Sequence, residues 1–174
     1  GLEQVENSGK EAIVNLLKSR VRNLEKTVNN TMATSLYADG TGTDGKELGG
    51  LQLIVPGTVG NTVGGINSTT YTFWQNQVYD FSTESVTPSA TTIQTAMNTL
   101  WLSTTRGADV PDCIVADTNY FNFYWSSLQT NQRFTSDDNA SAGFMNLMFM
   151  NAPVFFDDQC PTDKMYFLNT DYLF

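Results

Sequence analysis

Hydrophobic residues near the start of the chain recur at alternating intervals of three and four positions. The series consists of Val14, Leu17, Val21, Leu24 and Val28. This spacing is typical of the apolar stripe of an amphipathic helix. Ser8 and Glu11 have the spacing of a capping box, so the helix is predicted over 8–36. The stripe spans too few heptads to favour a coiled coil, and we expect one long helix packed against other protein.

Two shorter helices are predicted further along the chain. The apolar positions of the first are Ile93, Ala96, Met97, Leu100 and Trp101. Their spacing indicates an amphipathic helix over 91–105, ended by Arg106 and Gly107 because glycine readily adopts positive φ. Asp117 is a suitable N-cap for a second helix over 118–128, which is rich in aromatic residues.

Short apolar and aromatic runs predict strands between these helices. The predicted strands are 51–56, 71–81, 113–116, 144–150, 154–156 and 165–168. A turn at 151–153 separates two of them, and loops are expected at 39–50 and 135–142. Because helices and strands interleave irregularly, the fold class is predicted to be α+β.

The composition indicates a folded chain with few charged residues. The chain has 174 residues, of which 40% are hydrophobic and 16% are charged. This length fits one domain or two small lobes, and the apolar content is enough for a core. A charged fraction below the usual quarter leaves surfaces rich in Asn, Thr, Ser and Gln. Uncharged polar groups cost less to desolvate than ions, so the composition favours surfaces that meet other surfaces.

The charge balance argues against specific nucleic-acid binding. The formal net charge is −9, and only nine residues are Lys or Arg. Most of these lie in the first 26 positions, and 47–174 contains only Arg106, Arg133 and Lys164. Binding to a duplex needs clustered basic residues that release counterions. No apolar run reaches membrane-spanning length, so no membrane partner is expected.

The sequence lacks the usual residues of catalysis. It contains no histidine, which excludes Ser-His-Asp and Cys-His arrangements and the commonest metal ligand. Cys113 and Cys160 are too few for a disulfide scaffold and form no C-x-x-C pair, so a reduced cytosolic compartment is expected. Phosphate-binding glycine motifs are absent. The chain is therefore predicted not to be an enzyme, with no catalytic, cofactor-binding or metal-binding residues and no cofactor.

Paired carboxylates leave one chemical alternative open. Asp137-Asp138 and Asp157-Asp158 could serve a carbohydrate-active or carbohydrate-binding domain, or a calcium site. Adjacent carboxylates rarely converge on one point, so solvated loops are the favoured interpretation. The loop at 39–50 has Gly50 where a calcium loop needs Glu. The aromatic residues of 120–125 lack a neighbouring basic groove, which favours core packing over base stacking.

The ordered succession of these segments resembles that of HK97-fold capsid proteins of tailed phages and prophages. The run ENSGKEAIVNLLKSRVRNLEKTVNNTMATSLYADG is similar to the spine helix of that family. KELGGLQLIVP and GGINSTTYTFWQNQVYD look like a strand pair that crosses between two lobes. TTIQTAMNTLW and PDCIVADTNYFNFYWSSLQTNQRF are similar to the helix–strand–helix of an axial lobe. GFMNLMFMNAPVFFDDQCPTDKMYFLNTDYLF resembles the closing strands.

The resemblance implies a structural subunit of an icosahedral phage capsid. It predicts a spine helix with peripheral-lobe-like strands over 1–84 and an axial-lobe-like α/β domain with a return strand over 85–174. It also implies assembly with other copies of the chain into hexamers and pentamers around viral DNA, with scaffold and portal proteins as further partners.

The implied location is the virion, after assembly in the bacterial cytoplasm. The apolar end of the chain and the missing N-terminal arm predict a truncated core fragment, which by itself could be a monomer. An encapsulin-like compartment, which shares the fold, remains an alternative.

Overall fold

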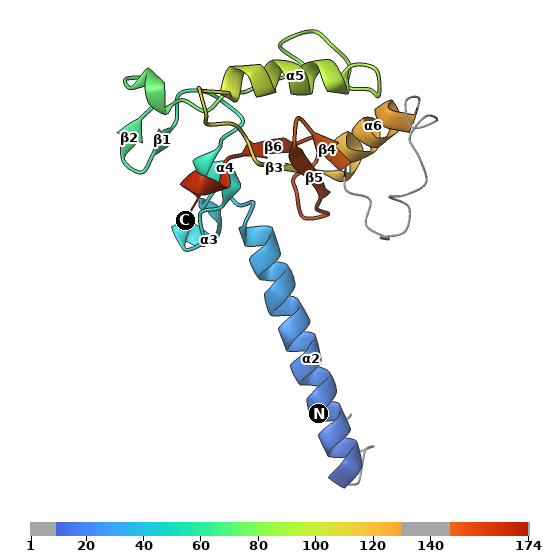
Figure 1. Ribbon diagram of the computed structural model, residues 1–174. Coiled ribbons are helices and arrows are strands. Elements are labelled where there is room, and N and C mark those ends of the chain that lie inside the picture. Colours follow the sequence, from blue (N-terminus) through green and yellow to red (C-terminus); the bar gives the residue numbers. More distant parts are fainter. Residues whose placement is uncertain (1–9, 130–146, 174) are drawn as a thin grey trace. The chain divides into compact units, whose positions relative to one another are not determined.

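A computed structural model describes residues 10–129 and 147–173 (Figure 1). The chain divides into two compact units, and the division falls between Leu51 and Gln52. Each unit is described by itself. The division into lobes over 1–84 and 85–174 stays a prediction.

Helices and short strands alternate along the described residues. The helices are α2 (Lys10–Ser35), α3 (Gly42–Gly45), α4 (Leu51–Ile54), α5 (Ile93–Thr104) and α6 (Thr118–Gln129), with 3-10 turns η1 (Thr72–Trp74) and η4 (Thr170–Tyr172). The strands are β1 (Thr62–Val63), β2 (Ile66–Asn67), β3 (Cys113–Ala116), β4 (Leu147–Phe149), β5 (Ala152–Phe156) and β6 (Met165–Leu168). The predicted α+β class is confirmed.

The long N-terminal helix is confirmed as α2, and the apolar stripe expected to pack is exposed among the described residues. Leu17 and Leu24 are each 63% exposed, and Val21 and Val28 are about half exposed. The predicted cap at Ser8 lies outside the described residues. The hydroxyls of Thr27 and Thr31 donate to carbonyls four residues earlier, which satisfies polar groups along the same helix. Among residues 10–129 and 147–173, the stripe is therefore an exposed apolar surface on a regular helix.

After α2 the chain closes a loop on itself. The N–H of Gly50 donates to the Ala38 carbonyl, and the N–H of Leu51 donates to the Leu36 carbonyl. A Cβ on Gly50 would collide with the Leu36 carbonyl, so only glycine allows this approach. The chain then forms the short helix α4. The predicted strand at 51–56 is therefore wrong: so short a segment has no periodicity that separates strand from helix.

The aromatic segment predicted as a strand over 71–81 is also irregular. It forms η1 and then an extended stretch that no described strand pairs with. Side-chain amides replace a strand partner here: Gln75 donates to the Ser68 carbonyl and Asn76 to the Pro56 carbonyl. A β-favouring composition therefore produced no strand, because no neighbouring backbone completes a ladder.

A four-stranded mixed sheet organises the second unit. The strand order is β4-β5-β3-β6. β3 pairs in parallel with β5 and antiparallel with β6, and β4 pairs antiparallel with β5. The strands predicted at 113–116 and 165–168 are confirmed, and the described part of 144–150 contains β4.

The turn between β4 and β5 lies one residue earlier than predicted. Met150 and Asn151 occupy it with φ of 48° and 72°, and Ala152 and Pro153 belong to β5 instead. Two residues with positive φ match the right-handed twist of the two strands, so the predicted turn at 151–153 is wrong by one position.

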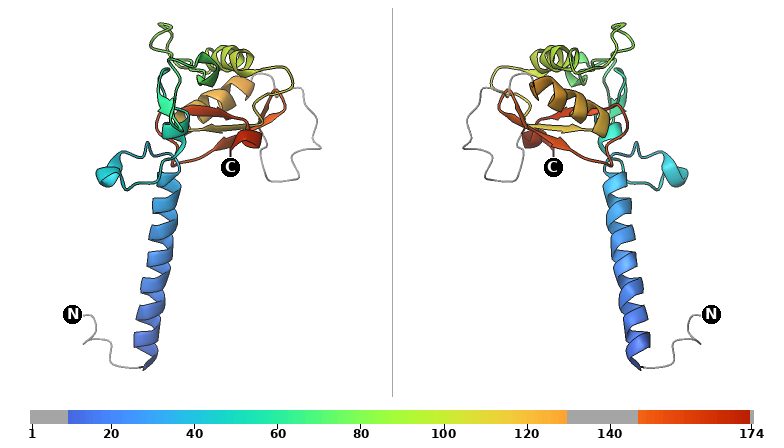
Figure 2. Two further views of the ribbon diagram at one scale, coloured as in Figure 1. Left: turned by 90° about the vertical axis from the view of Figure 1, so that its left-hand side faces the viewer. Right: turned by 90° about the vertical axis from the view of Figure 1, so that its right-hand side faces the viewer.

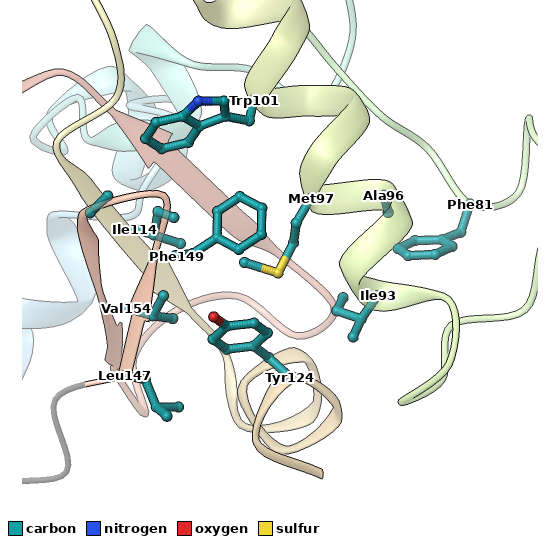
Figure 3. Close-up of a cluster of buried hydrophobic side chains, with 11 residues drawn as sticks. Phe81, Ile93, Ala96, Met97, Trp101, Ile114, Tyr124, Leu147, Phe149 and Val154 are labelled. Carbon is teal, nitrogen blue, oxygen red and sulfur yellow. The ribbon is translucent and has the colours of Figure 1, made fainter. Parts of the chain in front are cut away.

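Helices α5 and α6 cover one face of this sheet (Figure 2). Side chains of α5 and α6 meet those of the strands in one core, as Figure 3 shows. The core comprises Phe81, Ile93, Ala96, Met97, Trp101, Ile114, Tyr124, Leu147, Phe149, Ala152 and Val154. The helices predicted at 91–105 and 118–128 are confirmed as α5 and α6. The apolar stripe predicted for α5 is buried, except that Leu100 is only half-buried.

Asp117 joins the end of β3 to two other segments. One carboxylate oxygen accepts the N–H of Tyr120 at 3.0 Å, which is the predicted N-cap of α6. The other accepts the N–H of Asp163 at 2.9 Å, in the turn before β6. The backbone N–H of Asp117 also donates to the Lys164 carbonyl. The residue is 4% exposed, so these bonds form away from water.

Replacing this carboxylate should destabilise the fold. We expect Asp117→Ala to lower the free energy of unfolding by about 2–4 kcal/mol, because a helix cap is lost and the N–H of Asp163 loses its acceptor. Urea denaturation of both proteins measures the change. Asp158→Ala, an exposed carboxylate nearby, is the control and should change stability by less than about 0.5 kcal/mol. Equal losses in the two variants would contradict the role of Asp117.

Candidate assembly surfaces

The aromatic residues of α6 belong to the core, as the sequence predicted. Tyr124 is 2% exposed, and its hydroxyl donates to the Met148 carbonyl at 2.8 Å. Phe121 packs against Phe156, and Tyr120 against Phe81, with ring centroids under 6 Å apart. These rings are therefore occupied by packing rather than free to stack on a ligand.

The paired carboxylates do not converge into a site in the described residues. Asp157 forms a turn, in which its carboxylate accepts the N–H of Gln159 and its carbonyl accepts the N–H of Cys160. Asp158 is exposed. Asp137 and Asp138 lie outside the described residues. Over 10–129 and 147–173, no group of three or more acidic or Cys side chains could hold a metal ion.

The glycine-rich loop at 39–50 uses its carboxylates to close itself. Asp39 accepts the N–H and the hydroxyl of Thr41, and these bonds lower the pKa of Asp39. Glu47 accepts the N–H of Gly42 at 3.1 Å. Both carboxylates are thus engaged with their own loop instead of converging on a cation.

A cleft of about 560 Å³ lies beside α6. Its polar lining includes Asp80, Asn119, Tyr120, Asp163 and Lys164. Hydrogen bonds from the Ser82 N–H and the Thr83 hydroxyl, aided by the charge of Lys164, lower the pKa of Asp80. Burial, with the nearby carboxylates, raises the pKa of Tyr120 to about 12. The phenol therefore stays neutral, and the described residues that line the cleft include no paired nucleophile and base.

The exposed apolar side chains say more about possible binding than the cleft does. Several of them lie along α2 and around η1, and Met148 and Phe155 are exposed on the sheet. Large exposed apolar surfaces on a folded chain mark contacts with other molecules. In the described residues no helix is long and apolar enough to cross a membrane. Sequence reasoning assigned the residues of η1 to a strand and so missed this surface.

The similarity of this chain to known proteins lies in its fold. No family model and no curated protein matches the sequence. Among solved structures, the chain is similar to a chain of the cyanophage A-1(L) capsid asymmetric unit, with a TM-score of 0.59 and 22% sequence identity. Its fold is similar to that of a phage capsid chain. The match covers 97% of this chain and 52% of that chain, so this chain spans about half the length of the capsid chain.

The two cysteines are free thiols. Cys160 is buried, and its thiol donates to the Lys164 carbonyl at 3.7 Å. Burial, with the charges of Asp117 and Asp157, raises the pKa of Cys160 from 9.0 to about 12. Partial burial also raises the pKa of Cys113. Both thiols are held in the unreactive protonated form at neutral pH.

The raised pKa of Cys160 predicts a loss of stability in alkali. The folded state holds this proton more tightly than the unfolded state, so the contribution is complete below the unfolded pKa of 9.0 and decreases as the pH rises toward 12. We expect the thermal midpoint of the wild type to fall more steeply over this range than that of Cys160→Ala. Calorimetry at stepped pH measures both slopes, and parallel slopes would contradict the prediction.

Proposed function

We propose that this chain is a structural subunit of a phage capsid and assembles with other copies of itself. The single observation that carries the proposal is the similarity of fold to the cyanophage capsid chain over 97% of this chain. A shared fold by itself does not determine function, so the surfaces must supply further support.

The surfaces of the chain suit repeated contacts with other copies. Only 16% of the residues are charged, which lowers the cost of removing surfaces from water. The stripe on α2 presents the exposed side chains of Leu17, Val21, Leu24 and Val28 along several helical turns. In a closed shell, symmetry multiplies a modest contact into a stable assembly.

The proposal includes the HK97 type of fold and its two lobes. α2 is the spine helix of the peripheral lobe over 1–84, and α5, β3 and α6 belong to the axial lobe over 85–174. Copies would form hexamers and pentamers, with axial lobes at their centres. Scaffold and portal proteins are the expected further partners.

The particle would enclose viral DNA without binding its sequence. The net charge of −9 repels a duplex, so an acidic lining would let packaged DNA slide. The chain has a structural and non-enzymatic role in this proposal. It is located in the virion after assembly in the bacterial cytoplasm.

Electron microscopy of the complete gene product, expressed alone and together with its neighbouring genes, tests the function. Closed shells of regular size are the expected result. Persistent monomers under all conditions would overturn it. Terminase and portal genes beside this gene would support a capsid, whereas a cargo enzyme gene would support an encapsulin-like compartment.

The stripe on α2 should matter for assembly and not for the stability of the chain. We expect Leu24→Gln to reduce shell yield strongly while changing the free energy of unfolding by less than about 0.5 kcal/mol, because the side chain is exposed. Lys26→Gln, on the opposite face of α2, is the control and should leave the yield unchanged. Normal shells from Leu24→Gln would show that the stripe is not a contact.

A further inference from the structure

The segment between α4 and α5 carries a hydrogen-bonded module. β1 and β2 form a hairpin whose turn is Gly64-Gly65, with φ of 59° and 79° as a two-residue turn requires. Ser68 follows β2 and is 3% exposed. Its N–H and its hydroxyl both donate to the Asn61 carbonyl, at 3.0 and 2.7 Å. These two hydrogen bonds therefore join Ser68, which follows the hairpin, to Asn61, which precedes it.

The same module positions η1. The carbonyl of Ser68 accepts the side-chain amide of Gln75 at 2.8 Å. The carbonyl of Asn67 accepts the N–H of Tyr71 at 3.0 Å. These bonds hold both ends of η1 against the hairpin, so η1 is a fixed turn instead of a free loop.

This fixed turn displays three aromatic side chains to solvent. Tyr71 is 52% exposed, Phe73 72% and Trp74 46%, and the rings of Tyr71 and Phe73 contact edge to face at 6.0 Å. We call Tyr71, Phe73 and Trp74 the aromatic platform. Because hydrogen bonds hold the backbone that carries these rings, the backbone would lose little conformational freedom on contact.

The platform lies in the longest uncharged segment of the chain. No Asp, Glu, Lys or Arg occurs between Glu47 and Asp80. From Gln52 onward the chain has eleven acidic and three basic residues, so two copies repel each other over much of their surface. A contact between copies costs least in electrostatic energy where neither brings a charge. Depletion of charge together with Tyr, Phe and Trp is also the composition of interface cores.

We propose that the aromatic platform is a contact surface for a second copy of this chain. The inference rests on the proposed function, because it names one surface through which subunits meet. Nucleic acid is a poor occupant, since the segment has no Lys or Arg to neutralise phosphates. A second copy has the same acidic charge and is repelled by charged parts of the surface. An uncharged surface therefore favours a second copy more than it favours other partners.

A matched pair of substitutions at Thr72 tests the charge argument. Thr72 is exposed within the platform, and Asp and Asn differ there in charge but hardly in size. In the complete gene product, Thr72→Asp should reduce assembled particles by about tenfold or more, while Thr72→Asn assembles like the wild type. Equal assembly of the two variants would overturn the inference. Matching thermal midpoints confirm that neither variant is misfolded.

Photo-crosslinking identifies the occupant directly. Phe73 is replaced by a photoreactive phenylalanine analogue in the same complete protein, and the adduct is mapped by mass spectrometry after irradiation of assembled particles. Adducts to a second copy are the expected result. Adducts to another protein, to a glycan, or to residues 10–51 of the same copy would overturn the inference, and so would the absence of any adduct.

The two proposals fail in distinguishable ways. In one outcome the wild type forms shells, while the two Thr72 variants assemble equally and Phe73 gives no adduct to a second copy. In that case the platform is not a contact and the capsid function stands. If the wild type forms no particles, the capsid function fails first. Adducts between copies in solution without shells would support the platform as a self-contact outside a capsid.

Discussion

The second unit depends on β3 being paired on both sides and capped by a buried carboxylate. Ile114 and Ala116 of β3 are fully buried, and β5 and β6 complete its hydrogen bonds. Asp117 follows immediately and binds both the first turn of α6 and the turn that leads into β6. One side chain thus sets where α6 begins and where the returning strand enters the sheet. The core between α5, α6 and the sheet depends on that placement.

This arrangement separates two kinds of apolar side chain. Those of α5, α6 and the helix-covered face of the sheet pack into a core rich in aromatic contacts, such as Trp101 on Phe149 and Phe149 on Phe167. Those of α2 and η1 are held on regular or hydrogen-bonded backbone and remain exposed. An apolar surface on a rigid support differs from a random exposed residue, because little order is lost when a partner covers it. This contrast is what the proposed function requires of a subunit.

The scarcity of charge connects these surfaces to function. Several carboxylates in the described part hold local structure: Asp117 as a cap, Asp39 and Asp157 in turns, and Asp80 beside the cleft. The acidic side chains at the surface still repel a second copy, so the uncharged segment between Glu47 and Asp80 is where a contact between copies costs least. A chain that assembles through many weak contacts gains from this composition, since each contact has a lower desolvation cost and symmetry repeats it.

The sequence by itself determined the elements whose signal is local. The stripe from Leu17 to Val28 and the cap at Asp117 each correspond to the structure, because helix periodicity and capping depend on neighbouring residues. The run at 113–116 became a strand because β5 and β6 supply its partners. The absence of histidine and of metal spacing likewise limited the chemistry before any fold was known. Only the tertiary structure decided what 51–56 and 71–81 become, because a strand needs a partner backbone that the sequence does not specify. It also decided which apolar residues are core and which are surface: the stripes of α2 and α5 have the same periodicity, and only packing against the sheet buries the second.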